Sequence, residues 1–344
     1  MIKNNIVIIS YAYPPGMGGI ETVAETLRQE LRPFGCTIVT NTPSSACHDP
    51  EIFRRPAFGT LLKILGAARF IVVNHPSLRL TWPLLFWRRP HVVQIHHTPF
   101  TVKETLASTV TSFLKRLFCL ALGRNCFVSK SLQKAQALSG TVIYNPVRLG
   151  LGNSRAGSVN RPVRLLFMGR LTPVKAPDRF IDLISRLRAA NLDVEAHLMG
   201  QGELSEVVGA RISQSGLEDI LQRGVTRTTE EARAQYDWAD LVIIPSRTGI
   251  GFPAEGLPMV ALEAKTRGAV VIGTASGGLP EAIGQGGIVV DDDFEQLYQA
   301  CHDLVTDPQR LASLSLTALE EAKAFQPQTV INALLPQLAK GAPR

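Results

Sequence analysis

Short runs of β-branched and apolar residues alternate with longer stretches of helical period along the chain. In the first half these runs are Ile6–Ser10, Cys36–Thr40, Phe70–Val73, Val92–His96, Cys126–Ser129 and Thr141–Tyr144. Between the first two runs, an apolar stripe at helical spacing predicts a helix (Ile20, Val23, Ala24, Leu27, Leu31). Strands that alternate with helices predict a parallel sheet covered by helices on both faces.

A second series of the same kind begins after residues 149–162, a Gly- and Ser-containing stretch without periodicity that is the best linker candidate. Its predicted strands are Arg164–Met168, Val194–Met199, Leu241–Ile244, Val270–Gly273 and Ile288–Val290, with a helix over Pro177–Ala190. A chain of 344 residues that is 45% hydrophobic can bury two ordinary cores. We therefore predict an α/β protein of two doubly wound domains, whose ligands lie where strand ends of both face a shared cleft.

Several protein classes are excluded by composition. The longest apolar runs are far shorter than the ~20 residues that a membrane-spanning helix requires. The N-terminus lacks a long apolar segment followed by a cleavage site, so it predicts a first strand and not a signal peptide. The cysteines are odd in number and form no C-x-x-C pair, which is typical of reduced thiols in a cytosolic protein (Cys36, Cys47, Cys119, Cys126, Cys301).

The net charge of +7 is unevenly distributed. Residues 1–150 hold 17 Lys and Arg against 6 Asp and Glu, whereas residues 151–344 hold 19 against 23. A basic half attracts an anionic partner, unless its cations are simply solvated. Nucleic acid is disfavoured as that partner, because basic pairs such as Lys115-Arg116 are far apart and lack interleaved aromatic residues.

An anionic membrane surface fits this charge better. Residues 61–69 and 106–120 combine apolar stripes with cations and could form amphipathic helices at such a surface, although similar stripes also face protein cores. The apolar cluster from Trp82 to Trp87 is interpreted as buried packing.

Loops of the first half offer two candidate sites. The loop that contains Gly16, Gly18 and Gly19 leads into a helix, and glycines and free amides there can admit a phosphate or sugar, or serve a plain turn. It does not match the dinucleotide fingerprint G-x-G-x-x-G, because Glu21 stands where the third glycine is needed; an NAD enzyme is therefore disfavoured.

Histidines follow two strand ends of the first half. His75 and the pair His96-His97 stand where doubly wound sheets place ligand contacts, so they can orient hydroxyls or phosphates, although a histidine there is as often structural. No further Cys, His or carboxylate stands at a spacing that fits a zinc site.

The second half contains a cationic loop and a pair of glutamates. Arg170 and Lys175 follow its first strand, and together they predict a diphosphate site. Glu255 precedes a helix that begins near Pro258, and Glu263 is expected roughly two turns inside it. The two carboxylates would then contact hydroxyl groups at different depths. Residues 291–293, three aspartates before an apolar-periodic segment, are interpreted as a helix cap.

Taken in order, motifs along nearly the whole chain resemble glycosyltransferase family 4. They are Pro14-Pro15, Gly18-Gly19-Ile20-Glu21, His97, Gly169-Arg170, Lys175, Pro245-Ser246, Glu255, Glu263 and Gly277-Gly278-Leu279-Pro280-Glu281. The resemblance implies a retaining enzyme of the GT-B fold that uses nucleotide sugars and needs no metal or other cofactor. It also implies an acceptor-binding domain over residues 1–155, a donor-binding domain over 156–325, and a last helix over about 326–344 that packs back onto the first domain.

The resemblance assigns roles to individual residues. Arg170 and Lys175 would neutralise the donor diphosphate, Glu263 would hold the ribose hydroxyls, and Glu255 would contact the donor sugar. His97 would lie near the reacting anomeric carbon and the acceptor. The other implied donor contacts, to phosphate, sugar or base, are Gly18, Gly19, Gly224, Val225, Gly256 and Leu257.

The chain also departs from the family pattern. Residues 247–254 form an insertion rich in Gly and Pro where relatives usually have a much shorter stretch. Gly256-Leu257-Pro258 stands where many relatives have Gly-Phe-Gly, and Arg148 replaces an acidic residue. Because the insertion borders the sugar pocket that the resemblance implies, the choice between UDP- and GDP-sugars, and of acceptor, stays open.

The expected protein is a cytoplasmic hexosyltransferase, peripheral on the inner face of the plasma membrane. Its acceptor would be a glycan or a lipid-linked molecule in cell-surface polysaccharide or glycolipid biosynthesis. Two other classes stay open. A nucleotide-sugar epimerase of GT-B-like fold would convert the donor without an acceptor, and a non-catalytic nucleotide-sugar-binding subunit would not turn it over.

Overall fold

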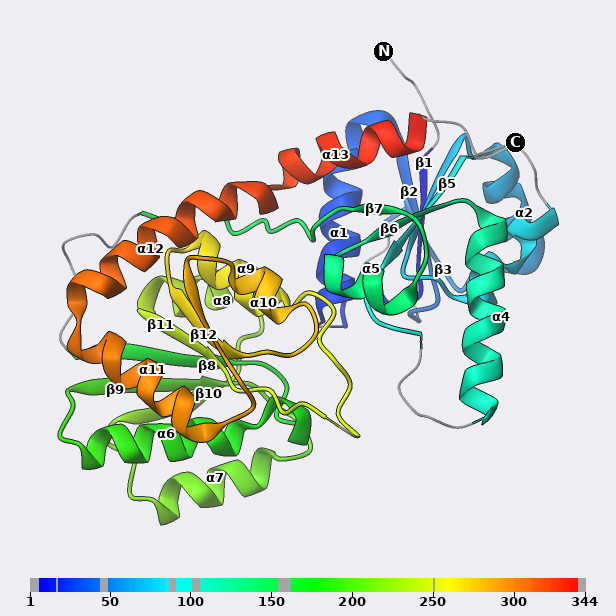
Figure 1. The fold of residues 1–344 in the computed structure, drawn as a ribbon. Helices are drawn as coiled ribbons and strands as arrows, with labels where there is room; N and C mark the ends of the chain where they lie inside the picture. The colour runs from blue at the N-terminus through cyan, green and yellow to red at the C-terminus, as the bar shows by residue number, and fades with distance from the viewer. Residues whose placement is uncertain are drawn as a thin grey trace. The chain divides into compact units, whose positions relative to one another are not determined.

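The computed structural model describes residues 6–16, 18–43, 49–86, 91–100, 106–153, 162–249 and 251–339. The chain divides into two compact units (Figure 1). The first comprises Met1–Arg148 and Gln326–Arg344, and the second comprises Leu149–Phe325. The predicted border between residues 155 and 156 lies outside the described residues.

The first unit is built on a parallel sheet of seven strands in the order β3-β2-β1-β4-β5-β6-β7. Every residue of β1 and β4 is buried, which explains why central strands are continuous apolar runs in the sequence. The strands are β1 (Ile6–Ser10), β2 (Cys36–Thr40), β3 (Ile52–Arg54), β4 (Phe70–Asn74), β5 (His91–His96), β6 (Arg124–Phe127) and β7 (Thr141–Val142).

Helices connect and cover these strands. They are α1 (Gly19–Leu31), η1 (Arg32–Phe34), α2 (Phe58–Ala67), α3 (Leu78–Thr81), η2 (Trp82–Phe86), α4 (Leu106–Leu122) and α5 (Lys130–Gln136). The predicted stripe of α1 is buried at Val23, Ala24, Leu27 and Leu31, and this helix contacts β1, β2 and β4. From the end of the chain, α13 (Pro327–Ala339) packs against α1 and β5 (Figure 1).

The second unit repeats the plan with six parallel strands in the order β10-β9-β8-β11-β12-β13. They are β8 (Val163–Met168), β9 (Val194–Met199), β10 (Leu221–Gly224), β11 (Leu241–Ile244), β12 (Val270–Thr274) and β13 (Gly287–Val290). Between them run η3 (Pro173–Lys175), α6 (Pro177–Ala189), α7 (Ser205–Gln214), α8 (Thr229–Trp238), α9 (Met259–Thr266), α10 (Leu279–Ile283) and α11 (Phe294–Thr306). Two more helices follow, α12 (Pro308–Ala322) and η4 (Lys323–Phe325).

Both sheets have one point where the strand order reverses. It lies between β1 and β4 in the first unit and between β8 and β11 in the second. Ligands of doubly wound sheets bind outside the carboxyl ends of the strands at such a point. The two pairs of strand ends are therefore the places to search for a site.

Several sequence-based interpretations can be compared with the structure. The helix-cap interpretation of residues 291–293 is confirmed, because the Asp293 side chain accepts a hydrogen bond from the Gln296 amide at 2.8 Å. The interpretation of the Trp82 cluster as buried packing is wrong for Trp82, Leu85 and Phe86, which are 44%, 44% and 78% exposed. Trp87 lies outside the described residues.

The start of the predicted linker is bound to the second unit. The Arg267 guanidinium donates to the carbonyl oxygens of Leu149 at 3.2 Å and Gly150 at 3.1 Å, and the Gly152 amide donates to the Thr266 carbonyl at 2.6 Å. Residues 154–161 lie outside the described residues. Cys36, Cys119, Cys126 and Cys301 are free and buried, and Cys47 falls in a range that is not described. Within the described ranges, no helix has both the length and the apolar character needed to cross a bilayer.

Candidate functional site

Lys175 and Glu255 form an ion pair at the carboxyl ends of β8 and β11. Their side chains are 23% and 15% exposed, so the pair is largely shielded from water yet reachable by a ligand. The hydroxyl of Ser246, which is fully buried, donates to the same Glu255 Oε1 at 3.1 Å. The structure thus brings together two predicted site residues, and adds Ser246 as the group that orients the carboxylate.

The Glu255 backbone is held by the turn before α10. The Gly278 amide donates to the Glu255 carbonyl at 2.8 Å. Gly277 has a φ of +53°, and a Cβ atom at this position would lie 2.1 Å from the same carbonyl oxygen. Only glycine combines this backbone conformation with so close an approach. The Gly277-Gly278 motif therefore positions Glu255.

The loop that carries Lys175 is held by Arg247. The Arg247 amide donates to the Val174 carbonyl at 2.8 Å, and its guanidinium donates to the Pro173 carbonyl at 2.9 Å and to Asp178 at 3.0 Å. The guanidinium holds the pKa of the Asp178 carboxyl below its ordinary value, against the opposing effect of burial. Because Arg247 contacts both sides of Lys175, it fixes the backbone of η3.

Thr248, the second residue of the 247–254 insertion, is also held in place by hydrogen bonds. Asp292 accepts hydrogen bonds from the Thr248 amide at 2.7 Å and from the Thr248 hydroxyl at 3.0 Å, and it pairs with Arg179. Sequence reasoning missed both anchors, because each joins residues that are far apart in the chain. Ile250 lies outside the described residues.

Glu263 lies in α9 and is partly buried. Tyr236, which is fully buried, donates its hydroxyl to Glu263 Oε2 at 2.7 Å. Burial raises the pKa of the Glu263 carboxyl, and the hydrogen bond from Tyr236 counteracts part of this rise. The expected depth of two turns is wrong: α9 begins at Met259, with Pro258 as its N-cap, so Glu263 is little more than one turn inside.

The remaining predicted residues of the second unit occupy neighbouring loops. Arg170 is exposed just beyond the end of β8, and Gly256 and Leu257 are buried beside Glu255. Gly224 ends β10 and accepts a hydrogen bond from the Gly200 amide at 2.8 Å, while Val225 is 39% exposed. All these residues follow carboxyl ends of the sheet.

In the first unit, Asn74 joins three segments at the β1/β4 reversal point. Its side-chain amide donates to the Ser10 hydroxyl at 3.1 Å and to the Ile20 carbonyl at 3.0 Å. Its oxygen faces His97 Nε2 at 2.7 Å. Because the amide nitrogen already donates to two acceptors, the group that faces His97 is the amide oxygen, which accepts a hydrogen bond from the Nε2–H of His97. The Nδ1 atom of the neutral ring is then a hydrogen-bond acceptor. Sequence reasoning missed Asn74, although it is a polar residue that ends a buried strand.

All three predicted histidines are held neutral. Burial, with a smaller effect of His75 and His96, lowers the pKa of His97 to about 3. Burial also lowers the pKa of His75 and of His96 to about 4. His96 is fully buried and stacks on Phe127, so it is a core residue, whereas His97 follows the strand end.

The glycine loop of the first unit leads into α1. Gly18 is the N-cap of this helix, and no side chain caps it within the described residues. Gly19 is the first helical residue. The amides of the first turn therefore lie next to the carboxyl end of β1, as an anion site requires.

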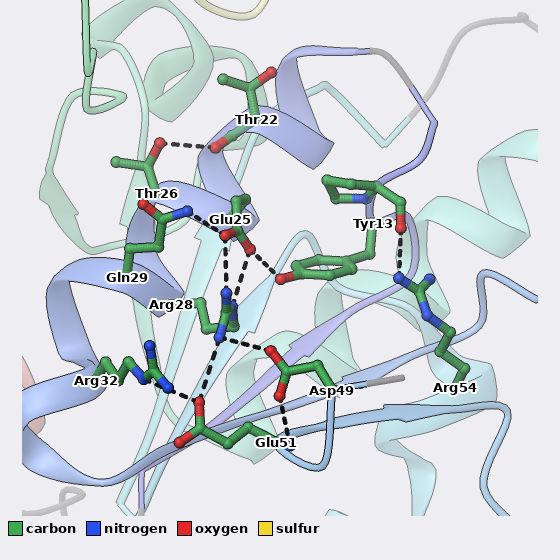
Figure 2. A network of polar contacts seen from close by, with 11 residues as sticks. Tyr13, Thr22, Glu25, Thr26, Arg28, Gln29, Arg32, Asp49, Glu51 and Arg54 are labelled. Atoms are coloured by element: carbon green, nitrogen blue, oxygen red, sulfur yellow. Dashed lines mark hydrogen bonds and ion pairs between the residues drawn. The ribbon is translucent and has the colours of Figure 1, made fainter. Parts of the chain in front are cut away.

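A polar network holds the segment before this loop (Figure 2). Glu25 on α1 accepts hydrogen bonds from Tyr13 and from the Arg28 guanidinium, the latter at 3.0 Å on both oxygens. Burial alone would raise the pKa of Glu25, but these hydrogen bonds hold it below its ordinary value. Arg28 in turn pairs with Asp49 and Glu51, at 3.3 Å each.

Arg54 secures the same segment from β3 by donating to the Pro14 carbonyl at 2.7 Å (Figure 2). The path of residues 13–15 is therefore fixed by side chains from α1 and β3. Within the part of the chain that the structure describes, no three His, Cys, Asp or Glu residues are grouped so that they could hold a metal ion.

Comparison with protein families and curated sequences gives consistent matches. Residues 162–307 match the family model of glycosyl transferases group 1. A GDP-mannose-dependent alpha-(1-6)-phosphatidylinositol monomannoside mannosyltransferase of Mycolicibacterium smegmatis is 34% identical over 168 residues, which are 47% of this chain and 43% of that protein. An amylovoran biosynthesis glycosyltransferase of Erwinia amylovora is 29% identical over 126 residues, 37% of this chain and 31% of that protein. The matched stretch spans less than half the length of either relative.

Solved structures with the same fold cover nearly the whole chain. HepE of Anabaena in complex with UDP and glucose superposes with a TM-score of 0.76 at 17% identity, covering 98% of this chain and 100% of that one. Sucrose-phosphate synthase of Thermosynechococcus elongatus gives a TM-score of 0.75 at 17% identity, covering 98% and 99%. With the family match of its second unit and its two doubly wound units, the chain is similar to family 4 glycosyltransferases and has the GT-B fold.

Proposed function

We propose that this protein transfers a hexose from a nucleotide-diphosphate sugar to a glycan or lipid-linked acceptor, with retention of the anomeric configuration. The transfer would belong to the biosynthesis of cell-surface polysaccharide or glycolipid. One observation carries the proposal: a lysine, a glutamate and a buried serine converge at the strand-order reversal of the second unit. A site of this kind offers a cation to a phosphate and a carboxylate to sugar hydroxyls.

The donor diphosphate is assigned to Arg170, Lys175 and the N-terminal amides of α9. Departure of a nucleoside diphosphate develops negative charge, and preorganised cations and helix amides stabilise it. In this proposal those protein groups neutralise the leaving group without a metal or another cofactor. The pair with Glu255 keeps Lys175 extended toward the β11 end until a phosphate oxygen replaces the carboxylate.

The sugar and ribose are assigned to separate carboxylates. Glu255, oriented by Ser246, accepts hydrogen bonds from donor-sugar hydroxyls. Glu263 accepts hydrogen bonds from the ribose hydroxyls, and Tyr236 favours its ionised form by donating to it. Gly224 and Val225 are assigned to the base, because they follow the edge strand of the same sheet.

Residues of the first unit are assigned to the reacting centre and the acceptor. His97 is neutral and donates from Nε2 to Asn74, so its Nδ1 is suited to accept a hydrogen bond from a hydroxyl and not to give up a proton. The uncapped start of α1, at Gly18 and Gly19, is suited to a phosphate or sugar oxygen.

The names of the relatives support either of two nucleotides, GDP or UDP, in the donor sugar. The Mycolicibacterium enzyme is named for GDP-mannose and for a phosphatidylinositol acceptor, and HepE was solved with UDP and glucose. We therefore propose a UDP- or GDP-sugar as donor, and a lipid-linked acceptor reached from the cytoplasmic face of the plasma membrane.

A donor panel tests the proposal. Binding and transfer would be measured for UDP-, GDP- and ADP-sugars with the wild type and with Glu255→Ala and Lys175→Ala. We expect one nucleotide class to bind, and each substitution to lower the transfer rate by roughly 100-fold or more. Lys323→Ala is the matched control, because it also removes a lysine from an ion pair with a glutamate, but on the exposed side of α12 and η4.

The same panel separates the alternatives. Transfer by Glu255→Ala at the wild-type rate would contradict the assignment. Conversion of the donor sugar without any acceptor would identify an epimerase, and binding without turnover against every acceptor offered would identify a non-catalytic subunit. NMR of the product's anomeric proton decides whether the configuration is retained.

A further inference from the structure

We propose that the first unit docks on an anionic lipid bilayer through the outer face of α4 and the aromatic edge beside it. The α4 face consists of Val110, Phe113, Leu114, Leu117 and Leu120. The aromatic edge consists of Phe58 on α2 and Trp82, Leu85 and Phe86 on η2. This inference is independent of glycosyl transfer, because it concerns where the chain resides and not what it converts.

The α4 face is apolar although it is open to solvent. Its five side chains are between 48% and 59% exposed, and they recur at the three- and four-residue spacing that aligns positions on one side of a helix. The opposite side of α4 buries Phe118, Cys119 and Leu122. The helix is therefore apolar on both sides, and burial in the unit's own core accounts for only one of them.

The aromatic edge enlarges the same surface. Phe58 and Trp82 stack with ring centroids 5.6 Å apart, and Trp82 meets Phe86 edge-on at 6.3 Å. Phe86 is 78% exposed, the largest exposed fraction among the exposed apolar side chains that the structure describes. The helices η2 and α4 contact each other, so the elements that carry the edge and the α4 face are neighbours.

Exposed apolar residues are distributed differently in the second unit. The large ones there are Leu151, Val207, Val225, Val289 and Leu316, which come from five separate segments. Single exposed apolar residues are ordinary on soluble proteins, whereas a contiguous apolar patch marks an interaction site. Only the first unit shows such a patch among the described residues.

The surplus of basic residues in this part of the chain favours an anionic bilayer as the partner of the patch. From residue 52 to residue 148 the sequence holds 14 Lys and Arg but one acidic residue, Glu104, which lies outside the described residues. The acidic residues at 25, 49 and 51 face Arg28 in the network of Figure 2. The stretch of chain that carries the patch thus combines exposed apolar side chains with a surplus of cations, the composition expected of a surface that lies in an anionic membrane interface.

The same charge disfavours a second copy of the chain as the occupant. Two identical faces would bring two cationic units together, and like charges repel. A bilayer that contains anionic lipid instead attracts the cations while its acyl region receives the apolar side chains. Trp82 suits the boundary between headgroups and acyl chains, because its ring is amphipathic.

Vesicle sedimentation tests the proposal. The full chain would be mixed at low salt with vesicles of phosphatidylcholine alone or of phosphatidylcholine with phosphatidylglycerol. We expect sedimentation with the anionic vesicles, weaker binding to the neutral ones, and release at high salt. The double variant Phe113→Gln with Leu117→Gln should lower the partition coefficient by about tenfold or more, because it removes two side chains from the apolar contact.

The matched control is Leu316→Gln on α12 of the second unit. Leu316 and Leu117 are both helical leucines with 48% exposure, so the control changes the same chemistry outside the patch and should leave vesicle binding unchanged. Far-UV circular dichroism confirms that each variant is folded.

Three results would overturn the proposal. The first is no sedimentation of the wild type with anionic vesicles at low salt, and the second is an equal loss of binding in Leu316→Gln and in the α4 variant. The third is a wild-type dimer in light scattering that is lost only in the α4 variant, while neither protein binds vesicles. Nucleotide-sugar binding, measured on the same samples, reports on the proposed function separately. A chain that binds vesicles but no donor supports the docking face and contradicts the function.

Discussion

At the residue scale, Gly277 shows how a backbone position controls a functional side chain. Its φ of +53° and the 2.1 Å approach of a hypothetical Cβ to the Glu255 carbonyl together exclude any other residue without a local shift. The position of Glu255, whose carboxylate pairs with Lys175, therefore depends on the absence of a Cβ atom at Gly277.

Gly277→Ala is expected to destabilise the protein by about 2–4 kcal/mol and to weaken donor binding, because the turn must move and Glu255 moves with it. Gly216→Ala is the control: Gly216 has a similar φ of +59°, but a Cβ there meets no atom within 4 Å. The control should cost only about 1 kcal/mol and leave donor binding unchanged. Denaturant unfolding and titration with the bound nucleotide measure both effects. Equal losses in the two variants would show that the contact with Glu255 is unimportant.

At the element scale, the sequence predicts the central strands of both sheets but only two of the four edge strands, β7 and β13. Central strands such as β1 and β11 are buried on both faces and appear as continuous apolar runs. Two edge strands, β3 and β10, were not predicted. β3 is three partly buried residues, and β10 carries exposed Gln222 and Arg223, so neither has an apolar run.

The candidate site was also predicted only in part. The loops that carry Arg170, Lys175 and Glu255 could be placed because they follow recognisable strands. The groups that orient them could not, because Arg247 meets Asp178 across 69 residues and Asn74 meets His97 across 23. Such contacts depend on strand order, which hydrophobic periodicity does not encode.

The ends of β4 and β5 bring three buried neutral histidines into one region, and this predicts a pH dependence of stability. Their pKa values in the folded chain are about 3 to 4, against an ordinary value of 6.5. Below pH 6.5 the unfolded chain binds protons that the folded chain does not. The stability is therefore complete above pH 6.5 and is lost as pH falls toward 4.

Each histidine is expected to remove up to about 1.4 kcal/mol of unfolding free energy per pH unit in that window. Urea unfolding at a series of pH values measures the slope, and His97→Gln should reduce it. A wild-type slope in His97→Gln would contradict the burial of a neutral imidazole at this position.

At the scale of the whole molecule, the proposed function assigns different roles in ligand binding to the two units. Apart from the pair at the start of α1, all proposed donor contacts lie in the second unit. We expect saturating UDP or GDP, at roughly 100 times the dissociation constant, to add about 3 kcal/mol to its stability.

Hydrogen exchange locates that effect. Slower exchange should concentrate after β8, around η3 and at the start of α9, and it should be absent in Lys175→Ala. Leu316→Gln, at an exposed position of α12, should show the wild-type protection. Protection confined to the first unit would contradict the donor assignment.

The return of α13 to the first unit has a consequence for the order of folding during synthesis. The first unit begins with β1 but includes α13, which packs against α1 and β5 after the complete second unit has been made. Residues 149–325 are contiguous and can fold once they have left the ribosome, whereas the first unit is completed only by residues that are translated after the second unit. A chain truncated before residue 327 would therefore contain the complete second unit and a first unit whose α1 and β5 lack α13 as a packing partner.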